Sequence, residues 1–195
     1  MGNPSVYEPD EDSFFLLDNL KTEISFLLPD NDRKNLSLLD MGAGSGYLGF
    51  EMAKLGLDVS LVDINSLAVT YMQLIIESND LQIPLYESDL FEKVPLKKFD
   101  VIIFNTPYLP NDGEFDDSAL HGGVHGYETA CRFIDQVTNF LSETGFILLL
   151  TSSLAKPEHI EEKAKEKGFS CKIIAQKSLF FEELQIYKLK IVTTK

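Results

Sequence analysis

The stretch from residue 36 to residue 46 constrains the fold of this chain more than any other. Residues 36–41 (LSLLDM) form a short apolar run typical of a buried β-strand, and the run breaks directly into Gly42, Gly44 and Gly46. Glycines allow a tight turn and let a ligand approach the N-terminus of the helix that follows. The sequence therefore predicts a strand, a glycine turn and a helix, with either a plain turn or a nucleotide-type cofactor site between them.

Strand and helix patterns alternate along the rest of the chain. Seven segments have the composition of strands: residues 36–41, 57–63, 83–87, 99–104, 145–150, 170–175 and 184–192. Helical patterns, among them residues 11–28 and 127–141, separate the strands until two strands follow each other at the end. We predict an α/β fold with a Rossmann-like sheet of about seven strands, mainly parallel with one antiparallel strand, and helices on both faces. Residues 1–195 are expected to form a single domain, in which residues 1–29 are an N-terminal segment and a covering helix.

Charge and composition narrow the possible partners. A net charge of −14 would repel a phosphate backbone, so binding of nucleic acid through bulk charge is disfavoured and a basic protein surface or cationic ligand is favoured. Cys131 and Cys171 are too few for a disulfide framework, and no apolar run has the length of a membrane span, so a cytoplasmic location is expected. His121 and His125 have a spacing compatible with a metal, but no further ligand completes a site, and no metal is expected.

Acidic residues stand at the ends of the first three strands. Asp63 could accept hydrogen bonds from ribose hydroxyls, and Ile64 would then lie against a purine. Asp89 could accept from an adenine amino group, whereas Asp40 disfavours a pyrophosphate and suits a cationic amino group. Each of these aspartates also has a plainer interpretation as a cap, a turn residue or a solvated loop residue.

The fourth strand ends in Asn105-Thr106-Pro107-Tyr108, which fits the holding of a planar NH2 group. The Asn105 side-chain oxygen and the Thr106 backbone oxygen can each accept one N–H, and the Tyr108 ring can pack on the flat face. Pro107 cannot donate to a strand ladder, so the chain leaves the sheet here. The alternative is a strand that simply ends at a proline and is followed by a core tyrosine.

Taken together, these stretches resemble a class I S-adenosylmethionine-dependent methyltransferase. Residues 40–46 (DMGAGSG), Asp63, Asp89 and residues 105–108 (NTPY) follow in that order. Two more stretches, residues 7–13 (YEPDEDS) and residues 122–126 (GGVHG), are similar to the short archaeal and eukaryotic form of the HemK/PrmC-related protein-glutamine N5-methyltransferases. The resemblance spans essentially the whole chain.

This resemblance implies a role for each matching residue. The cofactor, S-adenosyl-L-methionine, would leave as S-adenosyl-L-homocysteine. Its implied contacts are Tyr7, Ser13, Asp40, Gly42, Gly44, Asp63, Ile64, Asp89, Leu90 and Asn105. Asp40 and Gly42 would hold the methionine part, Asp63 the ribose, and Asp89 with the Leu90 backbone the adenine. Residues 7–13 would form a gate over the cofactor, which Ser13 closes.

The implied catalytic residues are Asn105, Thr106, Pro107 and Tyr108. The Asn105 side chain and the backbone of Thr106 and Pro107 would hold the substrate amide, with no general base required. One departure from the family is that Thr106 replaces the first proline of the commoner Asn-Pro-Pro-Tyr, so the rigidity of that ring is lost.

The resemblance also implies a substrate and a partner. The family methylates the glutamine of the Gly-Gly-Gln motif in class 1 peptide chain release factors. Its short form commonly works with a small zinc-binding activator subunit at the edge of the third strand, here Ile83 to Tyr86.

Three other functions remain open on the sequence. An N6-adenine methyltransferase of DNA or RNA would also hold a flat NH2 group, but the charge of the chain counts against it. A non-catalytic adaptor could keep the cofactor-binding fold. An NAD-dependent oxidoreductase is disfavoured because the third glycine of the dinucleotide fingerprint would fall at Tyr47.

Overall fold

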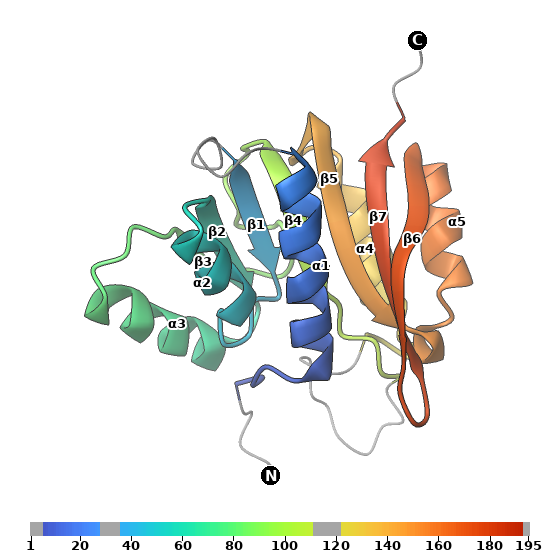
Figure 1. The fold of residues 1–195 in the computed structure, drawn as a ribbon, viewed down its shortest axis with the longest axis horizontal. Coiled ribbons are helices and arrows are strands. Elements are labelled where there is room, and N and C mark those ends of the chain that lie inside the picture. Colours follow the sequence, from blue (N-terminus) through green and yellow to red (C-terminus); the bar gives the residue numbers. More distant parts are fainter. Residues whose placement is uncertain (1–5, 28–35, 111–121, 193–195) are drawn as a thin grey trace.

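The sheet that organises this chain has seven strands in the order β3-β2-β1-β4-β5-β7-β6 (Figure 1). The computed structural model describes residues 6–27, 36–110 and 122–192. The strands are β1 (Ser37–Met41), β2 (Asp58–Asp63), β3 (Leu85–Glu87), β4 (Phe99–Asn105), β5 (Leu141–Ser152), β6 (Phe169–Ser178) and β7 (Glu183–Ile191). The helices are α1 (Glu11–Leu27), α2 (Tyr47–Lys54), α3 (Ser66–Ser78), α4 (Glu128–Val137), the 3-10 helix η2 (Ser153–Ala155) and α5 (Glu158–Glu166).

All strands except β7 run in the same direction, as the sequence predicted. β7 pairs antiparallel with both β5 and β6, and the other pairings are parallel. Strand order reverses at β1, which lies between β2 and β4 although β2 follows it in the chain. In open α/β sheets ligands bind outside the carboxyl ends of the strands at such a reversal. The topology alone therefore directs attention to the ends of β1 and β4.

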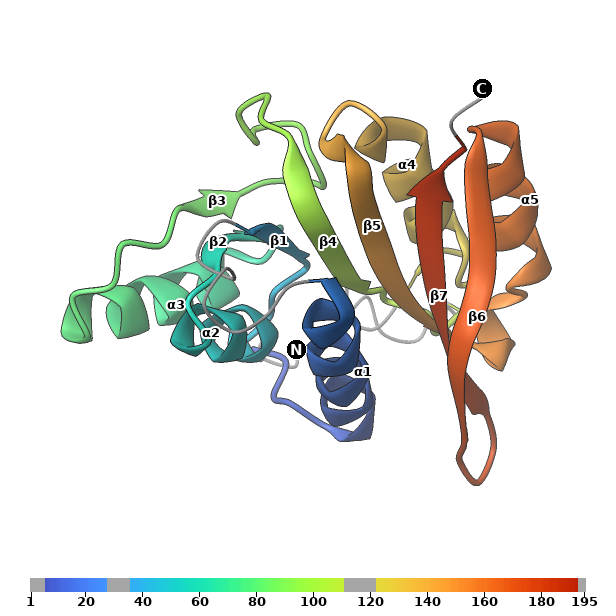
Figure 2. The same cartoon turned by 45° about the horizontal axis from the view of Figure 1, so that its top comes forward.

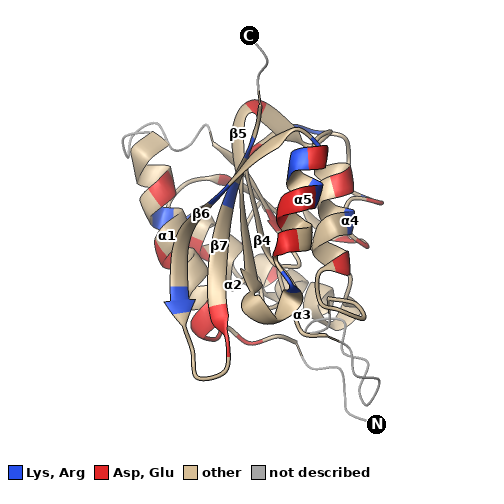
Figure 3. Cartoon of the chain, turned by 90° about the vertical axis from the view of Figure 1, so that its right-hand side faces the viewer, with Lys and Arg blue, Asp and Glu red and all other residues tan. Residues whose placement is uncertain are grey.

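Helices cover both faces of the sheet (Figures 2 and 3). One apolar core lies between the sheet and α1, α2 and α3, and the other between the sheet and α4 and α5. Buried residues alternate between the two cores along β1, so that Leu39 and Met41 face α4 while Leu38 faces α2. This alternation decides which polar side chains of β1 can reach a ligand.

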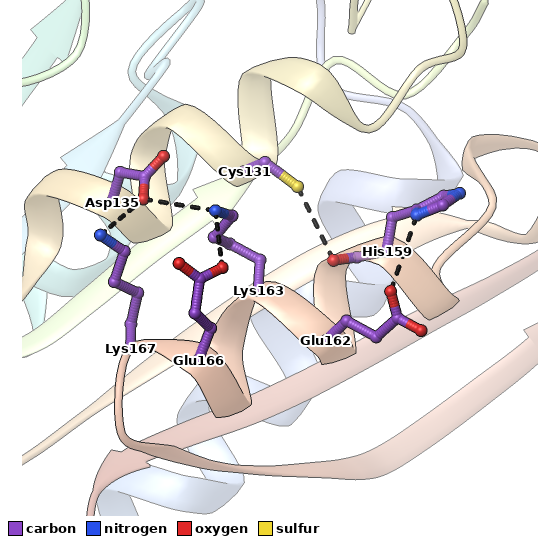
Figure 4. A network of polar contacts seen from close by, with 7 residues as sticks. All are labelled: Cys131, Asp135, His159, Glu162, Lys163, Glu166 and Lys167. Carbon is purple, nitrogen blue, oxygen red and sulfur yellow. Dashed lines mark hydrogen bonds and ion pairs between the residues drawn. The ribbon is translucent and has the colours of Figure 1, made fainter.

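The last two helices are joined by polar contacts on the surface (Figure 4). Asp135 of α4 pairs with Lys167 at 2.8 Å and with Lys163 at 3.6 Å, and Lys163 also pairs with Glu166 at 2.9 Å. The Cys131 thiol lies 3.8 Å from the His159 carbonyl oxygen. Exposed ion pairs of this kind contribute about 0–1 kcal/mol each to the free energy of unfolding. The packing of α4 and α5 on the sheet is therefore stabilised mainly by their buried apolar contacts.

Several boundaries differ from those expected. Leu141 was expected in a helix, but it begins β5 and pairs with Phe99, because the helix already ends at Val137. Within the first helix, Phe14 and Leu27 are partly exposed, whereas Leu16 is fully buried. Three features of the sequence lie outside the described residues: the acidic stretch 112–117, the end of the helix predicted for residues 11–28, and His121.

The third strand is the shortest member and lies at the edge of the sheet. It is limited to Leu85–Glu87 rather than residues 83–87, and Pro84 contributes only its carbonyl oxygen, which accepts from the Leu61 N–H at 2.9 Å. None of the described helices combines the length and apolarity needed to cross a membrane.

Candidate active site

A cavity of about 220 Å³ opens at the carboxyl ends of β1, β2 and β4, where the strand order reverses. It brings together residues from six separate parts of the chain. Its lining consists of Tyr7, Asp12, Met41, Gly42, Gly44, Asp63, Ile64, Asn65, Ala68, Ser88, Asp89, Leu90, Phe104, Asn105, Thr106, Pro107, Tyr108, Leu109, Thr129 and Arg132. All but two of the residues predicted to contact a cofactor or substrate lie in this lining; the exceptions are Ser13 and Asp40.

The glycine turn forms one wall of the cavity together with Asp63. One carboxylate oxygen of Asp63 accepts from the Gly44 N–H at 2.7 Å and the other from the Asn65 N–H at 2.8 Å. Each oxygen keeps a further lone pair, which is the arrangement needed for accepting from a vicinal diol. Burial raises the pKa of the Asp63 carboxyl above its ordinary value, and the N–H bonds from Asn65 and Gly44 oppose that shift.

The N-terminal segment lies directly over this turn. Gly44 has a φ of +57°, and a Cβ at this position would stand 3.3 Å from the Tyr7 Cβ and 3.4 Å from the Tyr7 carbonyl oxygen. A side chain there would be strained and crowded, so the close approach of Tyr7 requires glycine. Tyr7 therefore lies against the glycine turn, and the gate over the cofactor expected of residues 7–13 stays a prediction.

A second wall carries groups suited to a purine. Ile64 is 52% exposed and lies in the lining next to Asp63. Leu90 has a φ of +49°, uncommon for a residue with a Cβ, and its side chain is buried in the core. Arg132 of α4 donates to Asp89 at 2.6 Å. The ion pair fixes one carboxylate oxygen of Asp89 and leaves the other free to accept.

The orientation of the Asn105 amide is set by Asp12. The Asn105 Nδ2 donates to Asp12 Oδ2 at 3.0 Å, and the Tyr7 hydroxyl donates to the same carboxylate at 2.7 Å. An ionised carboxylate only accepts hydrogen bonds, so it selects the NH2 side of the amide and turns the oxygen away. The Asn105 Oδ1 is buried and has no partner among the described residues. A buried acceptor without a donor is rare in folded proteins, and the side chain that carries this one belongs to the lining of the cavity.

Thr106 is held by the neighbouring strand. Its backbone N–H and its side-chain hydroxyl both donate to the Leu150 carbonyl oxygen, at 3.1 and 2.8 Å. The side chain is buried, with 2% of its surface exposed. A proline at this position would have neither donor, so hydrogen bonds to β5 replace the ring in fixing the backbone.

The backbone of Pro107 and Tyr108 is enclosed by the glycines that follow residue 121. A Cβ on Gly122 would stand 2.3 Å from the Pro107 carbonyl oxygen, and a Cβ on Gly126 would stand 2.3 Å from that of Tyr108. The Gly122 N–H also donates to the Leu109 carbonyl oxygen at 3.0 Å. The glycine-rich stretch 122–126 is therefore a packing surface for residues 107–109, a role that the sequence did not suggest.

Two phenols lie beside the carboxylates of this site. The pKa of Tyr7 is raised by burial and then by its hydrogen bond to Asp12, and the pKa of Tyr108 is raised by burial and then by the charges of Asp12, Glu182 and Asp10. Both rings therefore stay neutral at physiological pH and offer apolar faces and a hydroxyl, not an anion.

Two of the predicted cofactor contacts lie behind the lining. Asp40 is buried under α2, where it accepts from the Gly49 N–H at 2.8 Å, and burial raises its pKa to about 7. Ser13 is buried as well, and its hydroxyl donates to Asp12 at 3.2 Å. Neither placement supports the expected direct contact. Both residues support groups that do line the cavity: Asp40 braces the helix after the glycine turn, and Ser13 braces Asp12.

Sequence reasoning missed two charged residues of the lining, Asp12 and Arg132. Asp12 lies within the stretch 7–13, but its partner Asn105 stands far along the chain, and no local pattern links them. Arg132 is one of only two arginines in the sequence, which was the available signal. Within the described residues no group of three or more His, Cys, Asp or Glu side chains could hold a metal, and His125 instead contacts Glu128 at 2.8 Å.

This combination of strand order and cavity defines a Rossmann-like methyltransferase fold. The family model of the methyltransferase small domain matches residues 3–180. A Methanocaldococcus jannaschii protein named "Putative protein N5-glutamine methyltransferase MJ0928" is 40% identical, over 94% of this chain and 91% of that protein. The chain belongs to the methyltransferase small domain family.

Two further relatives agree over nearly the full length. The Schizosaccharomyces pombe eRF1 methyltransferase catalytic subunit mtq2 is 27% identical, over 94% of this chain and 88% of its own. The solved structure of the E. cuniculi Mtq2–Trm112 complex, described as responsible for methylation of the translation termination factor eRF1, superposes with a TM-score of 0.74 at 26% identity and covers 95% of this chain and 98% of its own.

Proposed function

We propose that this chain transfers the methyl group of S-adenosyl-L-methionine to the side-chain amide nitrogen of a glutamine, that of the Gly-Gly-Gln motif of a class 1 release factor. The observation that carries the proposal is the buried Asn105 Oδ1, whose amide is oriented by Asp12 and which finds no donor among the described residues. The names of the M. jannaschii and S. pombe relatives support glutamine amide and release factor as the substrate.

The residues present fit the cofactor. Asp63 has free lone pairs for the ribose hydroxyls, Ile64 offers an apolar face, and Asp89 keeps one oxygen for an adenine amino group. The turn at Gly42 and Gly44 has backbone but no side chains to exclude the methionine part. S-adenosyl-L-methionine supplies, when bound, an electrophilic methyl group on a sulfonium. Aspartates around the cavity favour such a cation.

On the substrate side, the chain acts by positioning. Asn105 Oδ1 accepts one amide N–H, and the carbonyl oxygen of Thr106 or Pro107 accepts the other, while the Tyr108 ring packs on the flat face. Two acceptors in the plane of an NH2 group hold the nitrogen so that its lone pair faces the methyl donor. Orientation of this kind can lower a barrier by up to ~7–11 kcal/mol, so no general base is needed before transfer.

A release factor is favoured over an adenine base because of charge. Acidic side chains lie on α1, α4 and α5, on both sides of the sheet (Figure 3), and the net charge of the chain is −14. Such a surface repels phosphates and attracts a basic protein segment.

Mass spectrometry tests the proposal directly. A class 1 release factor is incubated with the chain and S-adenosyl-L-methionine, with and without a candidate activator subunit, and digested. One added methyl group on the Gly-Gly-Gln glutamine is the expected result. Methylation of an adenine-containing oligonucleotide, with none on the release factor, would establish the rival function instead.

Replacing Asp63 by alanine is expected to weaken binding of S-adenosyl-L-methionine by roughly 10–100-fold, because hydrogen bonds to a charged acceptor are worth about 1.5–3 kcal/mol. Titration calorimetry measures this dissociation constant. Asp58→Ala is the matched control, since Asp58 starts the same strand at its exposed end and pairs with Lys97. Equal affinity of the Asp63→Ala variant and the natural chain for the cofactor would show that Asp63 does not bind the ribose.

We also propose that a small activator subunit, expected to bind zinc, docks at the edge of β3. Among the described strands only β2 pairs with β3, which leaves its other edge open, and α3 presents Leu67, Tyr71 and Leu74 beside it, all more than 40% exposed. These residues recur at helical spacing and form one apolar stripe, which is typical of a covered surface. The paired subunits of the E. cuniculi complex support a two-chain assembly.

A Leu74→Lys substitution is expected to reduce co-purification with such an activator by at least tenfold, because it places a charge at the most exposed residue of the apolar stripe. Leu96→Lys is the matched control, since Leu96 is 79% exposed and lies outside the apolar stripe, just before the amino end of β4. An identical yield of complex from the two variants would place the partner elsewhere.

A further inference from the structure

The hairpin between β6 and β7 ends in two exposed phenylalanines. Phe180 is 90% exposed and Phe181 84% exposed, and their ring centroids lie 4.5 Å apart at an interplanar angle of 87°. They touch each other and leave most of their surface in water. Adjacent exposed aromatic rings on a folded chain mark an interaction site more often than isolated ones do.

The turn that carries the rings is firmly built. The Leu179 N–H donates to the Glu182 carbonyl oxygen at 2.8 Å, which closes a turn with the phenylalanines at its two central positions. Leu179 packs against the core, and the Glu183 N–H donates to the Ser153 hydroxyl at 3.0 Å. Glycine, asparagine and aspartate suit such turns for reasons of backbone geometry, and phenylalanine gives no such benefit. The turn itself therefore does not explain the two rings.

The hairpin lies at the same edge of the sheet as the cavity. β6 runs parallel to β4 and β5, so its carboxyl end, and the turn after it, are at the edge where β4 ends in Asn105. Figures 1 and 2 show the hairpin reaching beyond the sheet on the side where α1 begins. The turn is also connected to the amide-holding residues, because Leu179 packs against the same apolar core as Tyr108. In keeping with this, the charge of Glu182 contributes to the raised pKa of Tyr108, after burial and Asp12.

We propose that Phe180 and Phe181 dock on an apolar surface of the folded release factor whose glutamine enters the cavity. The inference rests on the proposed function and adds a second contact, outside the cavity, that recognises the protein around its Gly-Gly-Gln loop. A protein with a basic surface around an apolar patch fits best, because Glu182 and Glu183 follow the rings directly. The same carboxylates disfavour stacking of the rings on nucleic-acid bases.

The test compares two substrates. A Phe180→Ser, Phe181→Ser double variant is assayed, in the presence of the candidate activator, on a complete release factor and on a short peptide containing Gly-Gly-Gln. For the complete protein kcat/KM is expected to fall by roughly tenfold or more, as for loss of an aromatic contact at an interface, and for the peptide to stay within about twofold. Phe26→Ser is the matched control, since Phe26 is 79% exposed near the far end of α1.

Each other outcome overturns the inference in a recognisable way. An equal loss on protein and peptide would make the hairpin part of the cavity rather than a docking element. Unchanged kcat/KM on both substrates would exclude a docking role, and a dimer of the natural chain that the variant loses in sedimentation would assign the rings to a second copy. If the natural chain methylates neither substrate, the proposed function itself fails. Photocrosslinking from a Phe180→p-benzoylphenylalanine variant to the release factor gives a readout independent of turnover.

Discussion

An Asn105→Ala variant is expected to lose methyl transfer by roughly 10²–10³-fold in kcat while keeping its affinity for S-adenosyl-L-methionine, because the lost oxygen is an acceptor that acts on the substrate. In the natural chain Asp12 accepts from the Asn105 NH2 group, and the buried Oδ1 of this cavity-lining side chain has no partner among the described residues. A free acceptor in that position costs stability unless a donor enters, and so its presence is explained by a ligand. Single-turnover assays with saturating cofactor measure the loss.

Two further variants make this result specific. Asn105→Asp keeps the shape but places a second carboxylate beside that of Asp12, so it is expected to be as inactive as alanine. Asn139→Ala, at an exposed asparagine between α4 and β5, is expected to keep full activity. An Asn105→Ala variant that retains natural turnover would show that the substrate amide is held elsewhere.

Replacing Asp12 by alanine is expected to lower kcat by roughly 10–100-fold, although Asp12 acts through Asn105. Without the carboxylate, nothing selects the NH2 side of the Asn105 amide, which can then turn and present a donor where an acceptor is needed. Misplacement of a positioning group on this scale can reduce a rate by about 100-fold. The Tyr7 hydroxyl loses the same partner, so the segment over the glycine turn is expected to loosen and the KM for the cofactor to rise.

A graded series separates this positioning role from a general loss of structure. Asp12→Asn keeps one side-chain oxygen that can accept from Asn105, and its kcat is expected to lie between those of the natural chain and Asp12→Ala. Asp18→Ala removes an exposed carboxylate from the same helix and is expected to change neither kcat nor KM. Equal loss in Asp12→Asn and Asp12→Ala, together with a lowered melting temperature, would indicate a structural role only.

Much of the fold could be predicted because its signals are local. The glycine turn, the strand ends at Asp63 and Asn105, and the proline at residue 84 each restrict the backbone within a few residues, and the structure places them as those restrictions require. Helix ends were less certain. Leu141 continues the helical spacing of the residues before it, but pairing with Phe99 assigns it to β5, and only the folded sheet provides that partner.

Those site residues that lie at the ends of strands could be predicted from the sequence. The residues that were missed or misplaced show why the other contacts could not. Asp40 stands beside the glycine turn in sequence, but successive strand residues face opposite sides, so Met41 reaches the cavity and Asp40 lies under α2. Asp12 contacts Asn105, and Arg132 contacts Asp89, so each pair joins segments that are far apart in the sequence. The residues next to Asp12 and Arg132 in the sequence do not indicate these contacts.

The anchoring of Thr106 also limits how this motif can change. Its N–H and its hydroxyl both end on the Leu150 carbonyl oxygen, whereas the commoner proline would fix the same backbone by its ring. A single Thr106→Pro exchange would remove both donors at once and leave that buried oxygen without them. Threonine and proline therefore fix this backbone in two different ways. A single substitution from one to the other loses hydrogen bonds to β5, so the exchange requires a compensating change in β5.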